Sequence, residues 1–178
     1  MEAILFTMAE LGAHVDAIDT PEYYIRQRQE AHSPSSLSNK SIELAKLREK
    51  TYEKYRKSSK SLIKGRVSFI DMDIAELKKE NYYDLIVSWE TLEHIGNPQK
   101  TLENIHRALK PGGLTFHEYN PFFCLEGGHS LCTLDFPYGH VILNANDFYK
   151  YIKKYRPNEL KIAWNFYRFS LNRMTLND

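Results

Sequence analysis

Tyr83-Asp84-Leu85-Ile86-Val87-Ser88 is the stretch of sequence that decides the fold. Its apolar run is typical of a strand that is buried on both faces of a parallel sheet. Asn97-Pro98 then begins a helix, Pro111-Gly112-Gly113 breaks it, and residues 114–119 are expected to form a second strand. A strand, a helix and a strand in this order predict a crossover connection between parallel neighbours.

The rest of the chain continues this alternation in both directions. Strands are expected at 13–19, 66–70 and 159–169, and Gly12 ends the helix that precedes the first of them. The predicted fold class is therefore α/β, a doubly wound, mainly parallel sheet with helices on both faces. The predicted helices span residues 1–12, 20–32, 41–57, 97–110 and 144–155.

One domain is expected to span residues 1–178, because this length suits a single hydrophobic core. Within it, residues 33–65 are predicted to be a charged helical insertion. Residues 120–143 are rich in aromatic side chains and show no regular element, which predicts an aromatic loop or lid.

The composition is that of an ordinary soluble globular protein, with 42% hydrophobic and 26% charged residues. It argues against a disordered chain, a collagen and a coiled coil. The longest aliphatic run is Leu85-Ile86-Val87, so no membrane span is expected. No basic residue precedes the first apolar stretch, and two cysteines, Cys124 and Cys132, are too few for a disulfide framework. We therefore expect a cytoplasmic protein.

Positive charge is concentrated in residues 37–66, which carry 10 basic and 3 acidic side chains although the net charge is only +1. Such a block can attract an anionic substrate or a nucleic acid. The glutamates interleaved at helical spacing favour instead the solvated face of a surface helix. A nucleic-acid partner is therefore not expected.

Carboxylates follow two of the predicted strands, at the edge where parallel sheets bind ligands. Asp19 ends the strand at 13–19, and Asp71 and Asp73 follow the strand at 66–70. A carboxylate there can accept hydrogen bonds from ribose hydroxyls or from an adenine amino group. Each could instead only begin a turn, but two successive acidic strand ends favour a nucleoside site.

Four motifs in this order resemble those of the class I S-adenosylmethionine-dependent methyltransferases. Residues 10–19 resemble the family's second motif, and residues 67–74 its acidic adenine-binding motif. Residues 83–94 are similar to the strand and turn under the methionine end of the cofactor, and residues 109–114 to the turn into the fifth strand. The resemblance covers about residues 3–119, and the order of the motifs makes it specific.

This resemblance implies a Rossmann-like methyltransferase fold and S-adenosyl-L-methionine as the cofactor. It favours Asp73 over Asp71 as the acidic residue near adenine. The positions implied to bind the cofactor are Asp19, Thr20, Asp73, Ile74, Ser88 and Trp89.

The family's first strand and glycine-rich loop have no counterpart in the sequence. That strand is central in the family's sheet, so without it the strands at 13–19 and 83–88 would each expose an unpaired edge. We expect an N-terminally truncated methyltransferase domain that binds its cofactor weakly or not at all, or one in which another segment or chain fills the gap.

Glu90, Glu93 and His94 have the spacing i, i+3 and i+4, which places them on one face of a helical turn. Two carboxylates and an imidazole suit magnesium, manganese or zinc. The spacing resembles that in ubiquinone-biosynthesis O-methyltransferases and in small-RNA 2′-O-methyltransferases, which implies a metal that binds the acceptor. Alternatively, the pair Glu93-His94 only caps the turn. Candidates for a fourth ligand are His117, His129 and His140.

Methyl transfer to a hydroxyl also needs a base, and His94 or His117 could serve. His117 alternates with Phe116 and Glu118 along a predicted strand, so a buried structural role for it stays open. The aromatic side chains after residue 119 either stack on the acceptor or cover the core.

The leading functional hypothesis is a methyltransferase that acts on an oxygen of a small-molecule methyl acceptor. A second hypothesis is a catalytically impaired remnant of the fold that serves as a binding module. A third is an RNA 2′-O-methyltransferase, suggested by the metal-like trio and the basic block. The sequence offers no obvious surface of aromatic and arginine side chains on which RNA bases would stack.

Overall fold

The computed structural model describes residues 2–20, 46, 50, 53 and 64–175, which fall into two compact units, Met1–Ile74 and Ala75–Asp178. The predicted helices at 20–32 and 41–57 and the insertion at 33–65 lie, apart from these single positions, outside the described residues. A search of the described ranges finds no helix that is long and apolar enough to cross a membrane.

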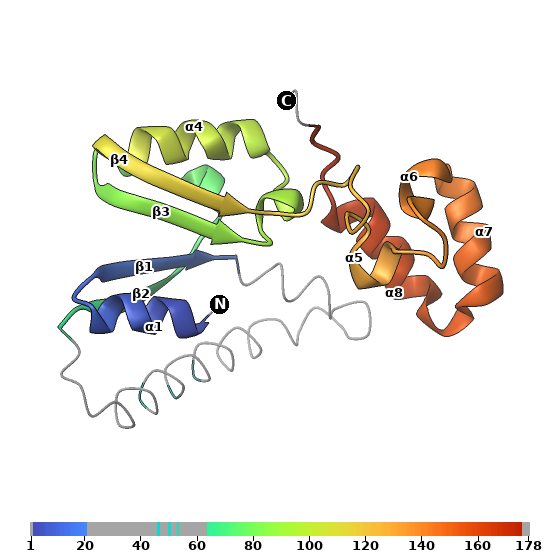
Figure 1. Ribbon diagram of the computed structural model, residues 1–178, viewed down its shortest axis with the longest axis horizontal. Helices are drawn as coiled ribbons and strands as arrows, with labels where there is room; N and C mark the ends of the chain where they lie inside the picture. The colour runs from blue at the N-terminus through green and yellow to red at the C-terminus, as the bar shows by residue number, and fades with distance from the viewer. Residues whose placement is uncertain (1, 21–45, 47–49, 51–52, 54–63, 176–178) are drawn as a thin grey trace. The chain divides into compact units, whose positions relative to one another are not determined.

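Helix α1 (Glu2–Glu10) and two parallel strands are the main described elements of the first unit (Figure 1). Helix α1 buries Phe6 and Ala9 and is followed by Gly12, whose φ of 104° suits only glycine. Strand β1 (His14–Asp19) pairs with β2 (Arg66–Asp71), and Asp19 is the register partner of Asp71. Both predicted strands are confirmed, and the two acidic strand ends are neighbours.

The second unit begins with the predicted strand, helix and strand. Strand β3 (Tyr83–Trp89) precedes helix α4 (Pro98–Ala108), and strand β4 (Leu109–Glu118) returns parallel to β3. Asn97 caps α4 by accepting a hydrogen bond from the backbone N–H of Lys100 at 3.0 Å. Helix α4 then packs beside β4 (Figure 1).

Pro111-Gly112-Gly113 interrupts the pairing of β3 with β4. Tyr83 pairs with Leu109 and Leu85 with Leu114, so the chain between the two pairs bulges out of register. Gly112 has a left-handed φ of 80°. The glycines thus form an irregularity within the strand, and the helix itself ends earlier, at Ala108.

Gly112→Ala is expected to lower the free energy of unfolding by about 1 kcal/mol, because a Cβ disfavours the left-handed backbone. No atom lies within 4 Å of that Cβ, so a clash contributes nothing. Thermal unfolding followed by circular dichroism measures the difference. Gly96→Ala is the control, since its Cβ is equally open and its φ is not left-handed. Equal losses at both positions would contradict the conformational explanation.

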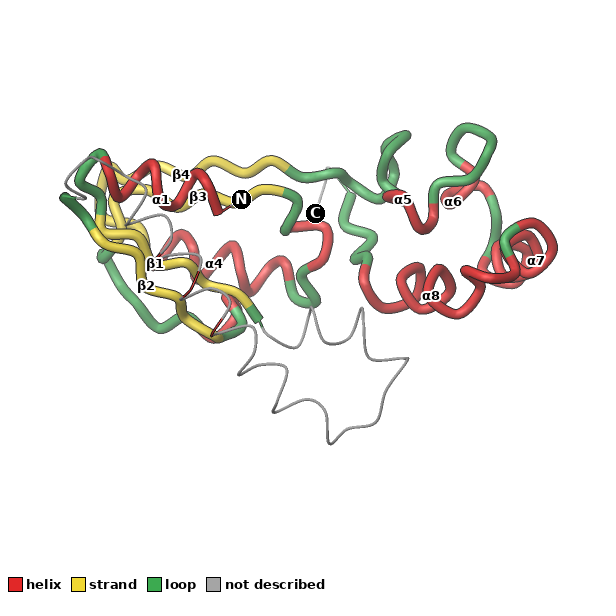
Figure 2. Tube along the Cα trace, turned by 90° about the horizontal axis from the view of Figure 1, so that it is seen from below, coloured by secondary structure: helices red, strands yellow, loops and turns green. Residues whose placement is uncertain are grey.

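A helical lobe completes the second unit, and it replaces the predicted closing strand at 159–169, which is wrong (Figure 2). Ala163, Phe166 and Tyr167 are buried at helical spacing, and the ring of Tyr167 stacks on that of Phe148 at 4.2 Å. These side chains therefore pack against another helix and not against a sheet. The elements are α5 (His129–Cys132), α6 (Gly139–Ile142), α7 (Ala145–Tyr155), η4 (Pro157–Glu159), α8 (Leu160–Asn165) and the π-helical turn η5 (Phe166–Ser170).

Two other predictions bear on this lobe. The helix predicted at 144–155 is confirmed as α7, and Asn144 caps it by accepting from the Asp147 N–H at 3.0 Å. The segment 120–143, predicted as a loop, contains the short helices α5 and α6.

Each sheet in the described part of the chain has two strands, β1-β2 and β3-β4. None of the residues of β3 is fully buried and Leu85 is 43% exposed, so the expectation that β3 is buried on both faces is wrong. The α/β order and the parallel pairing are confirmed. A single doubly wound sheet in one domain stays a prediction.

Candidate functional site

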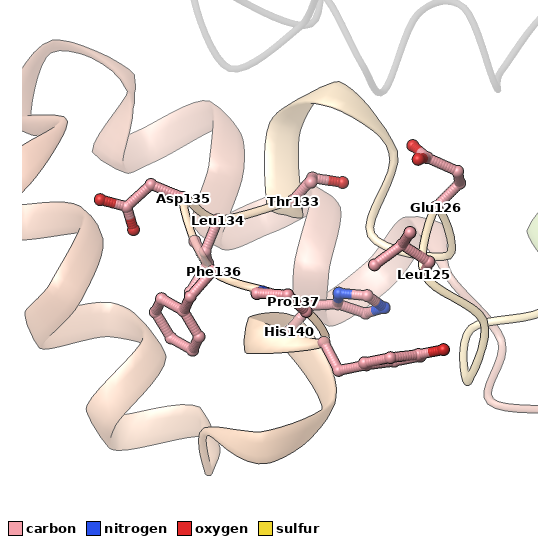
Figure 3. Close-up of a pocket in the computed structure, with 9 residues that line it drawn as sticks. Leu125, Glu126, Thr133, Leu134, Asp135, Phe136, Pro137 and His140 are labelled. Atoms are coloured by element: carbon pink, nitrogen blue, oxygen red, sulfur yellow. The ribbon is translucent and has the colours of Figure 1, made fainter.

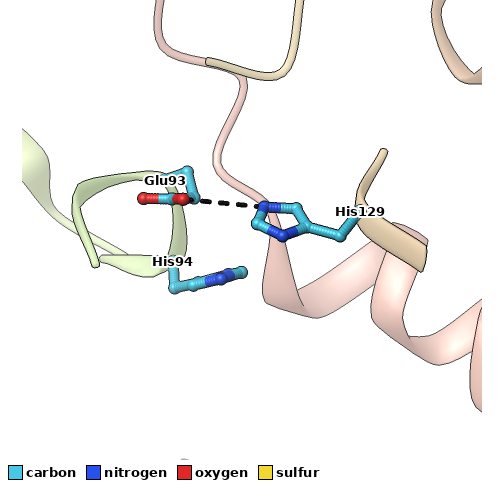
Figure 4. A group of neighbouring side chains, drawn as sticks. All are labelled: Glu93, His94 and His129. Carbon is cyan, nitrogen blue, oxygen red and sulfur yellow. Dashed lines mark ion pairs between the residues drawn. The ribbon is translucent and has the colours of Figure 1, made fainter. Parts of the chain in front are cut away.

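Glu93, His94 and His129 form a compact cluster in the second unit (Figure 4). One ligand atom from each side chain lies within 4.8 Å of the other two. Glu93 and His94 belong to η3 (Leu92–His94), the 3-10 turn that follows β3, and His129 begins α5. A carboxylate and two imidazoles are a donor set that suits transition metals such as zinc or manganese.

The backbone at Gly128 and His129 packs closely against neighbouring residues and has an unusual conformation. His129 itself has a left-handed φ of 50°, which is rare for a residue with a side chain. A Cβ at the preceding residue, Gly128, would lie 2.8 Å from the carbonyl carbon of Cys132 and 2.9 Å from the ring of His140. Strained backbone of this kind concentrates at functional sites.

Glu93 is a buried carboxylate, only 2% exposed, whose hydrogen bonding is incomplete. Its Oε1 accepts from the backbone N–H of Asn120 at 3.1 Å and lies 3.6 Å from Nε2 of His129. Among the described residues, Glu93 Oε2 and His129 Nε2 are both buried without a hydrogen-bond partner. Buried polar atoms are usually paired, so these two atoms are the polar atoms of the cluster that a ligand could engage.

His94 is oriented through its other ring nitrogen. Its Nδ1 donates to the backbone carbonyl of Ser170 at 2.6 Å, so the lone pair of the neutral ring lies on Nε2. The rings of His94 and His129 lie 4.9 Å apart, and each meets the ring of Phe166 at 5.8 Å. Packing thus holds both imidazoles beside the carboxylate.

Burial lowers the pKa of His129, and the neighbouring His94 lowers it further, while Glu93 and Glu90 act in the opposite direction. The net direction favours the neutral imidazole. A neutral imidazole offers a lone pair, which is the form that binds a metal.

Of the three predicted metal ligands, Glu93 and His94 lie together and Glu90 lies outside the cluster. Glu90 precedes η3, is exposed, and has a left-handed φ of 46°. The helical face that the spacing predicts therefore does not include it. His129, one of the candidate fourth ligands, completes the cluster, whereas His140 is buried and donates from Nε2 to the Phe122 carbonyl at 2.8 Å.

His117, the predicted base, is paired through both ring nitrogens. Its Nδ1 lies 2.7 Å from Ser88 Oγ, its register partner on β3, and its Nε2 lies 2.5 Å from Thr115 Oγ1. Burial lowers the pKa of His117. The ring is thus half-buried and held in place, with one hydroxyl at each nitrogen.

The predicted cofactor-binding residues belong to both units. In the first, Asp19 and Thr20 follow β1, and Asp73 and Ile74 follow β2; the Met72 N–H donates to the Asp19 carbonyl at 3.1 Å. Ser88 and Trp89 end β3 in the second unit. The convergence of all these positions on one nucleoside stays a prediction.

The segment predicted as an aromatic loop lines a pocket with a volume of about 260 Å³ (Figure 3). The carboxylates of Glu126 and Asp135 point away from each other at its two ends. Asp135 accepts a hydrogen bond from the Tyr151 hydroxyl, which raises the pKa of Tyr151 to about 12. The lining residues are Leu125, Glu126, Thr133, Leu134, Asp135, Phe136, Pro137, Tyr138 and His140.

Sequence reasoning did not single out several residues that support the cluster. Asn120, Phe166 and Ser170 contact it from loops and turns distant in sequence. The sequence near these residues does not predict their role, because they contact the cluster through backbone atoms or rings that come together only when the lobe has folded.

Comparisons with known proteins agree with the sequence motifs. A family model described as a methyltransferase domain matches residues 5–156. The ubiquinone biosynthesis O-methyltransferases of Rickettsia akari and Rickettsia bellii are each 25% identical to the chain over 99 residues. These matches cover 53% of this chain but only 37% and 38% of the two relatives, so the chain spans well under half their length. No solved structure gives a significant match.

Proposed function

Because the chain belongs to the class I S-adenosylmethionine-dependent methyltransferases, we propose that it transfers a methyl group to an oxygen of a small molecule. The observation that carries the proposal is the Glu93–His94–His129 cluster, in which Glu93 and His94 lie on the turn after β3 and His129 joins them from α5. Residues beyond the carboxyl ends of parallel strands are where such folds bind their ligands. The relatives named as O-methyltransferases support oxygen as the acceptor atom.

In this proposal the cofactor lies against the strand ends of a Rossmann-like sheet. Asp19 and Thr20 hold the ribose, and Asp73 and Ile74 flank the adenine. Ser88 and Trp89 lie at the methionine end. The neighbouring ends of β1 and β2 support the first part, since Asp19 and Asp71 are register partners.

Glu93, His94 and His129 are the residues that would hold a divalent metal. They fit one, because Glu93 Oε2 and His129 Nε2 are buried without a hydrogen-bond partner in the described structure, and the hydrogen bond from His94 Nδ1 to Ser170 leaves Nε2 as the donor atom toward a metal. When bound, magnesium, manganese or zinc would lower the pKa of the acceptor hydroxyl. The carboxylate of Glu93, which is buried, supplies the negative charge of the site.

The chain's own contribution to methyl transfer is positioning. Displacement at the sulfonium carbon is in line, so holding donor and acceptor in alignment supplies most of the catalysis. The acceptor proton needs a base, and we assign this role to His117, whose partial burial lowers its pKa and so favours the neutral ring. His94 is the alternative base in a metal-free site.

Calorimetry with S-adenosyl-L-methionine tests the proposal. The proposal requires binding at one site, however weak, and Asp19→Asn is expected to weaken that binding about tenfold or more through loss of charge-assisted hydrogen bonds. Asp84→Asn is the control, since Asp84 is exposed and pairs with Lys110 at 2.8 Å.

A chain that binds no cofactor would contradict the proposal and support the second candidate, a non-catalytic module. Salt-dependent binding to RNA would instead support a 2′-O-methyltransferase, because phosphate contacts release counterions.

A further inference from the structure

Asn172 connects the end of the chain to the turn that carries Glu93 and His94. Its backbone N–H donates to the Glu93 carbonyl at 2.8 Å. Its side-chain amide donates to the carbonyls of Ile95 at 2.9 Å and Leu92 at 2.5 Å. The remaining amide oxygen accepts from the Met174 N–H at 3.2 Å. Every polar group on this residue except its own carbonyl is therefore used within a few ångströms of η3.

This arrangement requires the chemistry of a short amide. Two N–H donors and one acceptor on one side chain are found only in Asn and Gln, and Gln is longer by a methylene. Aspartate has the same shape but only acceptor oxygens when ionised, so it would face the two carbonyls with negative charge. Asparagine and aspartate therefore differ at position 172 in the hydrogen bonds that they can make and not in their shape.

The carbonyls that Asn172 binds flank the two site residues on the turn. The Leu92 carbonyl also accepts from the Ile95 N–H at 3.3 Å, which closes the 3-10 turn, and Asn172 adds donors to this carbonyl and to those of Glu93 and Ile95. Contact at three points of the turn fixes its rotation, and with it the directions of the Glu93 and His94 side chains.

We infer that Asn172 is a positioning residue of the Glu93–His94–His129 site, an inference that rests on the proposed function. It acts through the backbone of η3 and touches neither metal nor substrate. The backbone carbonyl of Ser170, two residues earlier, accepts a hydrogen bond from His94 Nδ1 at 2.6 Å. The same segment therefore also sets the orientation of that ring. Residues that orient metal ligands from outside change metal affinity when replaced.

The test compares Asn172→Asp with Asn104→Asp. Asn104 on α4 is buried whereas Asn172 is half-buried, and it too donates from Nδ2 to a backbone carbonyl, that of Ala75 at 2.7 Å, so the control makes the same substitution at a hydrogen-bonded amide outside the cluster. Calorimetry with ZnCl₂ measures metal affinity. Long-range ¹H–¹⁵N spectra of the metal-free proteins report which nitrogen of His94 carries the proton. If Asn172→Asp does not fold, Asn172→Ala replaces it in both measurements, because alanine keeps the backbone N–H donor and adds no charge.

Asn172→Asp is expected to weaken zinc binding about 10- to 100-fold and to change the His94 imidazole signals. Asn104→Asp is expected to lower the unfolding temperature and leave both readouts unchanged. A folded Asn172 variant with the zinc affinity and the His94 signals of the parent protein would overturn the inference. If the parent protein binds no zinc, the proposed metal fails, and the imidazole signals of the metal-free variants then decide the role of Asn172.

Discussion

Alanine in place of His129 is expected to lower the affinity for zinc by more than about 100-fold, a larger loss than removing an outer hydrogen-bond partner causes. His129 supplies one of the three donor atoms that lie within 4.8 Å of one another, and its Nε2 is buried with no hydrogen-bond partner in the described residues. No neighbouring side chain in the cluster can replace that lone pair. Methyl transfer that depends on the metal is expected to fall in parallel.

Calorimetry with ZnCl₂ and with MnCl₂ measures this loss. His106→Ala is the matched control, because His106 is an exposed histidine on α4 and its removal changes the histidine count equally. The assignment of His129 as a ligand would be overturned if both variants bound zinc as the parent protein does. Loss of binding in both would show that zinc binds surface histidines instead.

The four described strands and the helices α1, α4 and α7 were predictable because their signals are local. Gly12 supplies a left-handed residue where α1 ends, and Asn97-Pro98 and Asn144 supply caps whose hydrogen bonds the structure shows. Each of these signals acts within a few residues of the boundary it determines. Tertiary context has little opportunity to override them.

The error at 159–169 has a different origin. Short apolar segments fit a strand or a buried helix equally well until their partners are known. Here the partner of Tyr167 is Phe148 on α7, and the stacked rings lie 4.2 Å apart. The sequence around Tyr167 carries no information about that partner, so the segment became a helix through packing.

The site was predictable only in part for the same reason. Glu93 and His94 are adjacent in sequence, follow β3 and match a family motif, and the structure places them together. His129 was one of three equivalent histidines, and its selection depends on the left-handed turn after Gly128. Asn172, 80 residues beyond Leu92, had no sequence signal.

Glu93→Gln is expected to change stability and metal binding in opposite directions. A buried carboxylate with one oxygen unpaired destabilises the metal-free fold, because its desolvation is not compensated. The neutral amide keeps an oxygen for the Asn120 N–H and removes the charge. The metal-free variant should therefore be more stable by about 1 kcal/mol, which raises the unfolding temperature by about 2–4 °C.

The same substitution removes the only carboxylate of the cluster, so zinc affinity should fall by more than about 100-fold and zinc should no longer raise the unfolding temperature. Thermal unfolding in EDTA and in ZnCl₂ measures both effects on one sample. Glu103→Gln is the control, because Glu103 is an exposed carboxylate on α4. A purely structural carboxylate would give the opposite pattern, with lower stability in EDTA and no change in the response to zinc. Residues kept at a cost in stability are those that function requires, so a gain in stability coupled to a loss of metal would identify Glu93 as a functional residue.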